Sequence, residues 1–299
     1  MTAHQNNALN VLPTAKNSRT DKDTYCEEDV YFTKQDGKNS PLDTSRVDSY
    51  LDVISNLDLT TYVTYNASDE DLETYGLDNP ELTLTVQYTP EDDEETEEKE
   101  DTEQTFILNI SRDPKEAEKA AKEEKKESDD EASDEEEEIT AYVRVGDSKI
   151  VYQITGDQYE DLMKASYDDL RHQEVLSADF ADIEQIDISL EGKDYTITAK
   201  GKDDDRKYYY GEEELEIDDF ESAITSLMAD SFTDKEPEGK EEISLTVHLD
   251  NENYPEVSIE LYRYYGSYCQ AVVDGEPVSL VERTSVVNLV EAVNAIVLN

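Results

Sequence analysis

Apolar residues recur along this chain with two periods, one typical of helices and the other of strands. Spacings of three and four residues predict amphipathic helices at 44–57, 156–167, 218–227 and 286–293. Alternation of apolar and polar residues predicts strands at 25–33, 82–88, 106–110, 183–190, 195–199, 243–247, 257–261, 269–273 and 278–281, with a hairpin at 139–154. Helices and strands in this order predict the α+β class.

The most sharply bounded stretch is SDEDLETYGLDNPELTLTV at 68–86. Ser68 is a good N-cap, and the Asp71 carboxylate can face the unpaired N–H groups of the first turn. Gly76 follows where a residue with positive φ would end the helix, and Leu77 can contact Leu72 as in a Schellman motif. The stretch therefore predicts a short capped helix that ends at Gly76 and passes into a strand.

The second half of the chain repeats the order of elements found in the first. Each half is predicted to run as a strand or hairpin, a helix, four mostly antiparallel strands and a second helix. The repeat is much longer than the 20–50 residues typical of a solenoid. We therefore predict two tandem repeats, at 25–170 and 171–299, each a mostly antiparallel sheet covered on one face by helices.

Three segments lack a core-forming pattern. Residues 1–24 are polar and predict a disordered tail, and acidic inserts interrupt the first repeat at about 89–104 and 111–138. The second insert contains PKEAEKAAKEEKKE, whose charge spacing supports a transient helix. Without an apolar stripe we expect it to stay mobile. The spaced D-x-D-x-D-G loop of a calcium site is absent, which favours a solvated insert over a cation site.

Charge narrows the range of partners. The 299 residues carry a formal net charge of -51, which opposes nucleic-acid binding because phosphates must be neutralised by Lys and Arg. Anionic membrane surfaces are disfavoured for the same reason. No apolar run approaches the roughly 20 residues that span a bilayer, and the first residues lack the apolar region of a secretory signal. We expect a soluble chain as written, with no membrane insertion of its own.

The residue types that carry most protein chemistry are few and scattered. His4 lies in the predicted tail, His172 in a connection and His248 in a strand, which indicates neither a catalytic triad nor a metal cluster. G-x-S-x-G, phosphate-loop and G-x-G-x-x-G motifs are absent from the sequence. We predict no catalytic, cofactor-binding or metal-ligating residues. Cys26 and Cys269 are too few for a disulfide framework, and a single bridge and two free thiols both stay open.

Tyrosine is abundant, with 20 residues, and it clusters in the second half. The cluster comprises Tyr208, Tyr209, Tyr210, Tyr262, Tyr264, Tyr265 and Tyr268. Successive strand residues point to opposite faces, so we expect some of these rings to be exposed. Exposed tyrosines on these second-half strands would suit a protein or glycan partner. The alternative is that tyrosine simply favours strands.

Three stretches carry a family resemblance. YGLDNPELTLTV at 75–86, PLDTSRVDSYLDVISNLDLTTYV at 41–63 and AYVRVGDSKIVYQITGDQYEDLM at 141–163 resemble the domain of unknown function 4340 family. The resemblance covers residues 42–190, and its most specific piece is Tyr75–Asp78 followed by Pro80. It implies a bacterial, envelope-associated protein, usually with one N-terminal membrane helix and sometimes encoded beside ABC-type transporter components. It implies no catalytic residues. This chain departs from the pattern by lacking that helix and by carrying the acidic inserts.

We therefore predict a non-enzymatic interaction or accessory module of the bacterial cell envelope, associated with an ABC-type transport system. One alternative is a hydrolase acting on envelope polymer through paired carboxylates, and another is an acidic cation-binding protein. Localisation outside the cytoplasm depends on an upstream membrane anchor. The genomic sequence before Met1 would separate an envelope protein from a cytoplasmic one.

Overall fold

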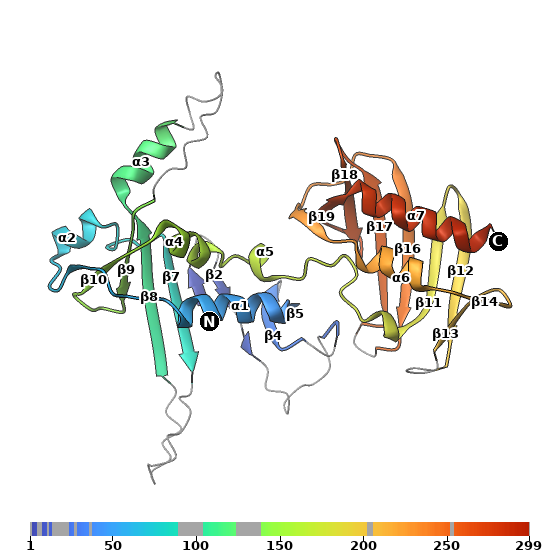
Figure 1. Cartoon of the computed structure of the whole chain (residues 1–299), viewed down its shortest axis with the longest axis horizontal. Helices are drawn as coiled ribbons and strands as arrows, with labels where there is room; N and C mark the ends of the chain where they lie inside the picture. Colours follow the sequence, from blue (N-terminus) through green and yellow to red (C-terminus); the bar gives the residue numbers. More distant parts are fainter. Residues whose placement is uncertain are drawn as a thin grey trace, which may run out of the picture. The chain divides into compact units, whose positions relative to one another are not determined.

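A computed structural model of the chain (Figure 1) describes residues 2–4, 8–10, 12–13, 24–26, 29–35, 38–88, 104–123, 139–201, 206–251 and 254–298.

The chain forms two compact units. As far as their residues are described, unit 1 comprises Met1–Pro13, Tyr31–Gly37 and Thr44–Leu170, and unit 2 comprises Thr14–Val30, Lys38–Asp43 and Arg171–Asn299. The predicted α+β class is confirmed. Two segments before residue 44 thus belong to the second unit, although the sequence analysis placed residues 25–43 in the first repeat.

Unit 1 is organised around a seven-stranded sheet with the order β2-β1-β7-β8-β9-β10-β6. Its strands are β1 (Thr2–His4), β2 (Ala8–Asn10), β6 (Tyr62–Thr64), β7 (Leu82–Tyr88), β8 (Gln104–Arg112), β9 (Ala141–Val145) and β10 (Val151–Ile154). All neighbours in this sheet are antiparallel. Strands β3 (Leu12–Pro13) and β4 (Tyr31–Gln35) pair separately. The segment predicted as a tail therefore supplies three short strands, β1 to β3.

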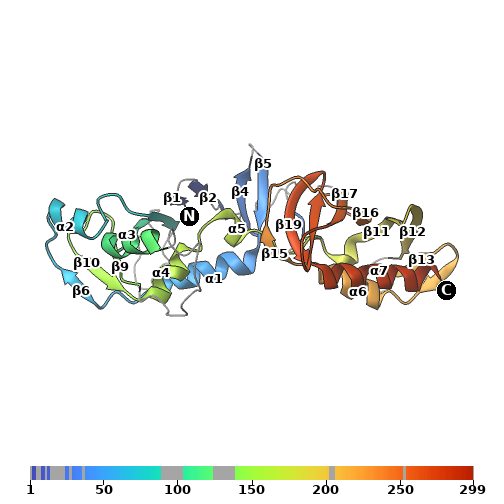
Figure 2. The same ribbon diagram turned by 90° about the horizontal axis from the view of Figure 1, so that it is seen from above.

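The helices of unit 1 are α1 (Thr44–Ser55), α2 (Asp69–Thr74), α3 (Pro114–Glu123), α4 (Gly156–Met163) and α5 (Tyr167–Leu170). Helices α1 and α4 lie side by side (Figure 2), and the Tyr50 hydroxyl donates a 2.6 Å hydrogen bond to the Leu162 carbonyl. Leu84 and Leu108 pair across β7 and β8 and are fully buried. Such alternate burial is what the period-two pattern predicts.

The corner at residues 68–86 is confirmed in detail. Ser68 and Asp71 form a reciprocal capping box at the start of α2. Gly76 has φ +70°, and the Leu77 N–H donates to the Leu72 carbonyl at 2.9 Å, as a Schellman motif requires. The Gly76 carbonyl in turn accepts a 2.8 Å hydrogen bond from Ser111 on β8. Backbone chemistry within a few residues thus fixes how α2 meets the sheet.

The acidic inserts fall largely outside the described residues, at 89–103 and 124–138. Residues 114–123 of the second insert form α3. Asp113 caps this helix by accepting from the N–H groups of Lys115 and Glu116. Glu116 also accepts a 2.8 Å hydrogen bond from the Thr140 N–H. The start of α3 is therefore tied to the strand that follows the insert.

Unit 2 contains a nine-stranded sheet with the order β14-β13-β12-β11-β16-β17-β18-β19-β15. Its strands are β11 (Ile183–Leu190), β12 (Lys193–Lys200), β13 (Lys207–Tyr210), β14 (Glu213–Leu215), β15 (Ala229–Phe232), β16 (Glu241–Leu249), β17 (Glu256–Arg263), β18 (Tyr268–Val273) and β19 (Glu276–Glu282). Its helices are α6 (Asp218–Thr225), α7 (Arg283–Val297) and the 3-10 turn η1 (Phe180–Asp182), and β5 (Lys38–Leu42) also belongs to its residues.

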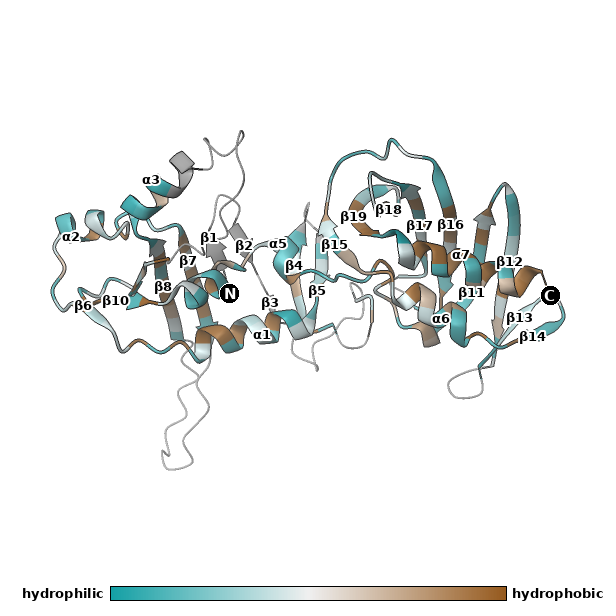
Figure 3. Cartoon of the chain, turned by 45° about the horizontal axis from the view of Figure 1, so that its top comes forward, coloured by the Kyte–Doolittle hydropathy of each residue, from teal (hydrophilic) through white to brown (hydrophobic). Residues whose placement is uncertain are grey.

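One face of the unit 2 sheet carries the core. Ile186, Val247 and Ile259 lie on neighbouring strands and pack with Phe220 of α6 and Leu289 of α7. Hydrophobic residues lie along α7 and along the strands beside it (Figure 3). Residues that alternate with this core must point to the opposite face of the sheet. That face is mostly polar.

The two sheets share a strand order. The run β7-β8-β9-β10-β6 in unit 1 has the same order along the chain as β16-β17-β18-β19-β15 in unit 2. Helices α1 and α6 precede the edge strands β6 and β15, and helices α4 and α7 follow β10 and β19. No helix stands between β15 and β16 at the place that α2 occupies in unit 1. This order is compatible with the predicted tandem repeat, which stays a prediction.

Residues 233–240 take the place of α2 in unit 2. A Cβ on Gly239 would lie 1.7 Å from the Arg263 carbonyl oxygen, so only glycine fits this approach of two backbones. The Gln270 side-chain amide, on the polar face of β18, donates to the Lys235 carbonyl. The segment therefore covers part of the polar face near β17 and β18.

Candidate histidine–carboxylate site

Four polar side chains from three segments of unit 2 meet at one place. Asp29 and Asp43 come from the two N-terminal segments of the unit, and His172 and Glu174 follow its boundary at Arg171. Glu174 forms an isolated antiparallel bridge with Met228, just before β15, and the Val175 N–H donates to Leu227 O at 2.9 Å. The His172 ring and the Glu174 carboxylate lie close together, with Nδ1 3.6 Å from Oε2.

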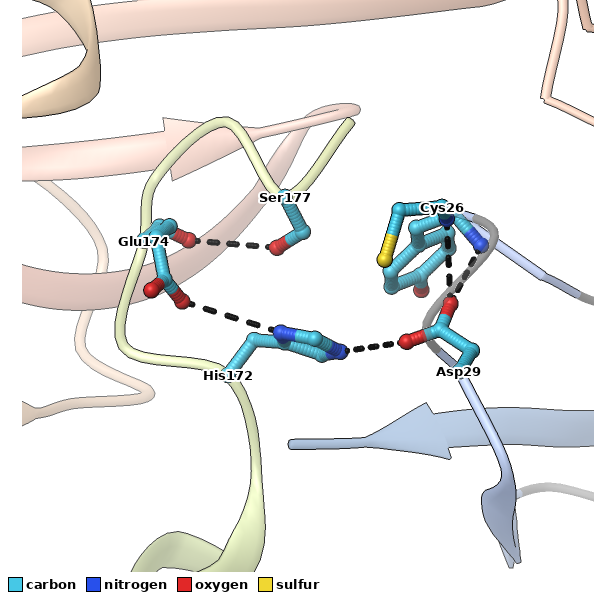
Figure 4. A network of polar contacts seen from close by, with 6 residues as sticks. Cys26, Asp29, His172, Glu174 and Ser177 are labelled. Carbon is cyan, nitrogen blue, oxygen red and sulfur yellow. Dashed lines mark hydrogen bonds and ion pairs between the residues drawn. The ribbon is translucent and has the colours of Figure 1, made fainter. Parts of the chain in front are cut away.

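Asp29 anchors the site from its buried side. Its side chain is 1% exposed, and Oδ2 accepts hydrogen bonds from the N–H groups of Tyr25 at 2.6 Å and Cys26 at 3.2 Å. Its Oδ1 lies 2.9 Å from Nε2 of His172 (Figure 4). A buried carboxylate is tolerated when it is paired and hydrogen-bonded in this way.

His172 bridges two carboxylates. Its side chain is 15% exposed, and Nδ1 lies 3.6 Å from Oε2 of Glu174 on the opposite side of the ring from Asp29. Burial disfavours the charged ring, but Asp29 and Glu174 outweigh burial and raise the pKa of His172 to about 9. The contact with His172 lowers the pKa of Glu174. With a pKa of about 9, the His172 ring is protonated at neutral pH, and it lies between Asp29 and Glu174.

Two tyrosines form an aromatic wall beside the imidazole. The Tyr25 ring centroid lies 6.1 Å from that of His172 and 4.6 Å from that of Tyr254. Burial raises the pKa of Tyr254. The two rings thus pack on one another, and Tyr25 contacts the imidazole.

The site brings together three side chains whose atoms could ligate a metal ion. One ligand atom each from Asp43, His172 and Glu174 lie within 4.8 Å of one another. Oε2 of Glu174 is inaccessible to solvent and makes no hydrogen bond. The sequence analysis predicted no metal-ligating residue, and that stays a prediction. The convergence of these atoms is not visible in the sequence, because Asp43 and His172 are far apart along the chain.

A second histidine cluster lies on the polar face of the unit 2 sheet. Nε2 of His248 on β16 is 3.0 Å from Oδ2 of Asp187 on β11, and Nδ1 is 3.2 Å from Oε2 of Glu256 on β17. Thr196 and Gln185 also donate to Asp187. Burial tends to raise the pKa of Asp187, but these donors and His248 outweigh it and lower that pKa. Among the residues that the structure describes, no third ligand atom converges with this cluster.

The predicted tyrosine cluster is dispersed. Tyr208 is buried and donates to the Phe180 carbonyl at 3.1 Å. Tyr209 lies under the Lys200 ammonium, and Tyr262 donates to Glu260. Tyr264 and Tyr265 remain exposed, at 39% and 89%. The second-half strands thus do not present one aromatic surface.

A different aromatic group appears in unit 1, at the sheet edge formed by β6. The rings of Tyr62 and Tyr65 stack with centroids 4.8 Å apart, and Tyr62 lies 5.0 Å from Tyr152 on β10. Tyr62 is 48% exposed and Tyr65 69%. We call these three residues the β6 tyrosine group. Its sequence signal is weak, because two of its members lie in a short link and the third in a hairpin.

The two cysteines and a hollow between α6 and α7 are weaker candidates for a functional site. Cys26 and Cys269 are free thiols, and burial raises the pKa of Cys269, which leaves its thiol unreactive. Asp219 and Glu291 both line an open hollow of about 470 Å³ between α6 and α7.

The fold defines an α+β protein built on open antiparallel sheets with helices packed on them. A family model described as Domain of unknown function (DUF4340) matches residues 34–245. The chain belongs to this family. No curated protein and no solved structure matches it. Among its described residues, no helix is long and apolar enough to cross a membrane.

Proposed function

We propose that this chain is a non-enzymatic accessory module of the bacterial cell envelope that binds a protein partner, in association with an ABC-type transport system. Membership of the family supports the setting, since the family resemblance implies an envelope location and neighbouring transporter components. The observation that carries the binding role is the β6 tyrosine group at the edge of the unit 1 sheet.

The edge strand offers backbone as well as side-chain contacts. β6 is the last strand in its sheet and pairs on one side with β10. Among the described residues, no strand pairs with its other side. An extended segment of a partner can add to such an edge through main-chain hydrogen bonds. Tyr62 and Tyr65 stand beside that edge as ready-made anchors, because exposed tyrosine is enriched among the residues that dominate binding energy.

Charge indicates the kind of partner. With a net charge of -51, the chain attracts positively charged surfaces and repels acidic ones. A basic partner would associate faster at low ionic strength. We therefore propose a partner that combines an extended segment with Lys or Arg near it.

A photo-crosslinking experiment tests this proposal. Benzoylphenylalanine replaces Tyr65 in one version of the chain and Tyr88 in a control, since Tyr88 is also an exposed tyrosine of unit 1, at 45%. In cells that produce the chain, we expect irradiation to give a discrete adduct from position 65 and not from position 88. Fractionation should place the adduct in the envelope, and mass spectrometry should identify its protein partner.

The substitution Tyr62→Ser provides a second arm. Removing this anchor should weaken the adduct from position 65 at least fivefold, because a tyrosine anchor contributes about 1–2 kcal/mol or more. Equal labelling from positions 65 and 88, or an adduct insensitive to Tyr62→Ser, would contradict the proposal. An adduct found in the cytoplasmic fraction would keep the binding role and reject the envelope location.

A further inference from the structure

We propose that Asp43, His172 and Glu174 bind a divalent transition-metal ion of the zinc class, with Asp29 as the residue that orients the histidine. The ligand atoms of these three residues already lie within 4.8 Å of one another. Zinc bonds to nitrogen and oxygen of about 2.0–2.2 Å place tetrahedral ligands roughly 3.4 Å apart. Shifts of about an ångström in side chains of intermediate burial would bring the three atoms to that separation.

The contact between Asp29 and His172 has the form found behind metal-bound histidines. A ligating imidazole usually donates its second N–H to a carboxylate, which fixes the tautomer and the ring orientation. Nε2 of His172 makes this contact with Asp29 at 2.9 Å. The other nitrogen, Nδ1, is the one that faces Glu174. A metal ion that displaces the Nδ1 proton would leave Nε2 protonated against Asp29, with the lone pair of Nδ1 directed to the side where Glu174 lies.

An independent observation concerns the acceptor on that side. Oε2 of Glu174 is shielded from solvent and has no hydrogen-bond donor. Its 3.6 Å separation from Nδ1 is too long for a hydrogen bond. Buried polar atoms without a hydrogen bond are uncommon in folded proteins and call for an explanation such as a bound ion. A cation between Nδ1 and Oε2 would give Oε2 a closer partner than its 3.6 Å ion pair with His172.

The donor set selects the class of metal. One imidazole and two carboxylates suit zinc and neighbouring transition metals, whereas calcium and magnesium prefer sites made wholly of oxygen. Three protein ligands leave a fourth position of a tetrahedral zinc open. The cluster around His248 lacks a convergent third donor. It therefore serves as an internal control within the same unit.

Histidine NMR can test the site in the full chain, because the sequence contains only three histidines. Imidazole nitrogen signals would be followed during addition of zinc chloride in excess magnesium chloride, which occupies weak acidic sites. His172→Asn and His248→Asn variants assign the signals. At one equivalent of zinc we expect Nδ1 of His172 to shift to the range of metal-bound nitrogen, while the signals of His4 and His248 stay in place.

Matched variants then locate the ligands. Glu174→Gln and Asp43→Asn should each weaken zinc binding at least tenfold, and Asp29→Asn about 10–100-fold as an orienting residue. Glu256→Gln, which changes the equivalent partner of His248, should leave the affinity unchanged. In each variant, unshifted His248 signals show that unit 2 is folded. Glu174→Gln is expected to fold normally, because the Glu174 side chain is 37% exposed. No response of His172 to zinc, or equal affinity in Glu174→Gln and the unmodified chain, overturns the proposal.

Discussion

His172 and His248 have the same chemical partners in very different surroundings. Each ring directs Nε2 to an aspartate and Nδ1 to a glutamate. The aspartate of the first cluster is 1% exposed, whereas that of the second is 40% exposed. The first cluster joins segments far apart in the chain, and the second lies across three strands of one sheet. The two clusters should therefore contribute very differently to the free energy of unfolding, because the effect of an ion pair on stability depends on its burial.

The largest difference is expected when the two aspartates are removed. Asp29→Ala leaves the His172 ring and two backbone N–H groups without a buried acceptor, and should lower the free energy of unfolding of unit 2 by about 3–5 kcal/mol. Asp187→Ala should lower it by about 1 kcal/mol or less. Urea unfolding followed by hydrogen exchange of the unit 2 core strands measures both. Equal losses would remove the distinction between the clusters.

Replacing the histidines should separate local from global effects. His172→Asn weakens the attachment of Asp29, so the Tyr25 and Cys26 amides that donate to it should exchange with solvent about tenfold faster, which corresponds to about 1.4 kcal/mol. His248→Asn should not change exchange at these two amides. Hydrogen exchange at these two amides can be measured in both variants by mass spectrometry or NMR. The distinction fails if both variants affect residues 25 and 26 alike.

The contribution of the His248 cluster to stability should depend on pH. The lowered pKa of Asp187 means that its carboxylate is favoured in the folded state. Its contribution to stability is therefore present above the unfolded pKa, near pH 4, and is lost as pH falls through the lower folded value. Thr196→Val, which removes one donor, should move the pKa of Asp187 upward in a carboxyl NMR titration. An unchanged pKa would show that Thr196 does not stabilise the ionised form.

The smallest effect is expected at His248 itself. The change His248→Gln at neutral pH should alter the free energy of unfolding of unit 2 by no more than about 0.5 kcal/mol, because its partners are partly solvated. Denaturant unfolding in parallel with the unmodified chain provides the measurement. A loss above about 2 kcal/mol would place the second cluster in the same energetic class as the first.

Sequence reasoning worked where the determinants are local. The capping box of Ser68 and Asp71 and the positive φ of Gly76 depend on residues within one or two turns. The long strands followed from alternation, since one face of each is buried. Residues 60–65, which contain β6, were predicted only as a short β-prone link, and β15 was not predicted, because three or four residues are too few to show a period.

The candidate site could not be predicted, because its partners meet only through tertiary structure. Asp29 and His172 are 143 positions apart, and Asp43 stands in another segment. With carboxylates so abundant in this chain, no aspartate could be singled out from the sequence. The one local signal was His172 and Glu174 two residues apart, since an extended backbone places such a pair on the same face.

The path of the chain through unit 2 also sets an order of events during synthesis. Asp29 leaves the ribosome 143 residues before His172 does, and unit 1 supplies most of the chain between them. Unit 1 can fold while translation continues, as N-terminal units generally do. The segments before residue 44 that belong to unit 2 must wait for strands not yet made. A nascent chain stopped at residue 170 should therefore leave residues 24–26, 29 and 30 open to protease. Their protection in longer nascent chains would report that the strands of unit 2 have been synthesised and have folded.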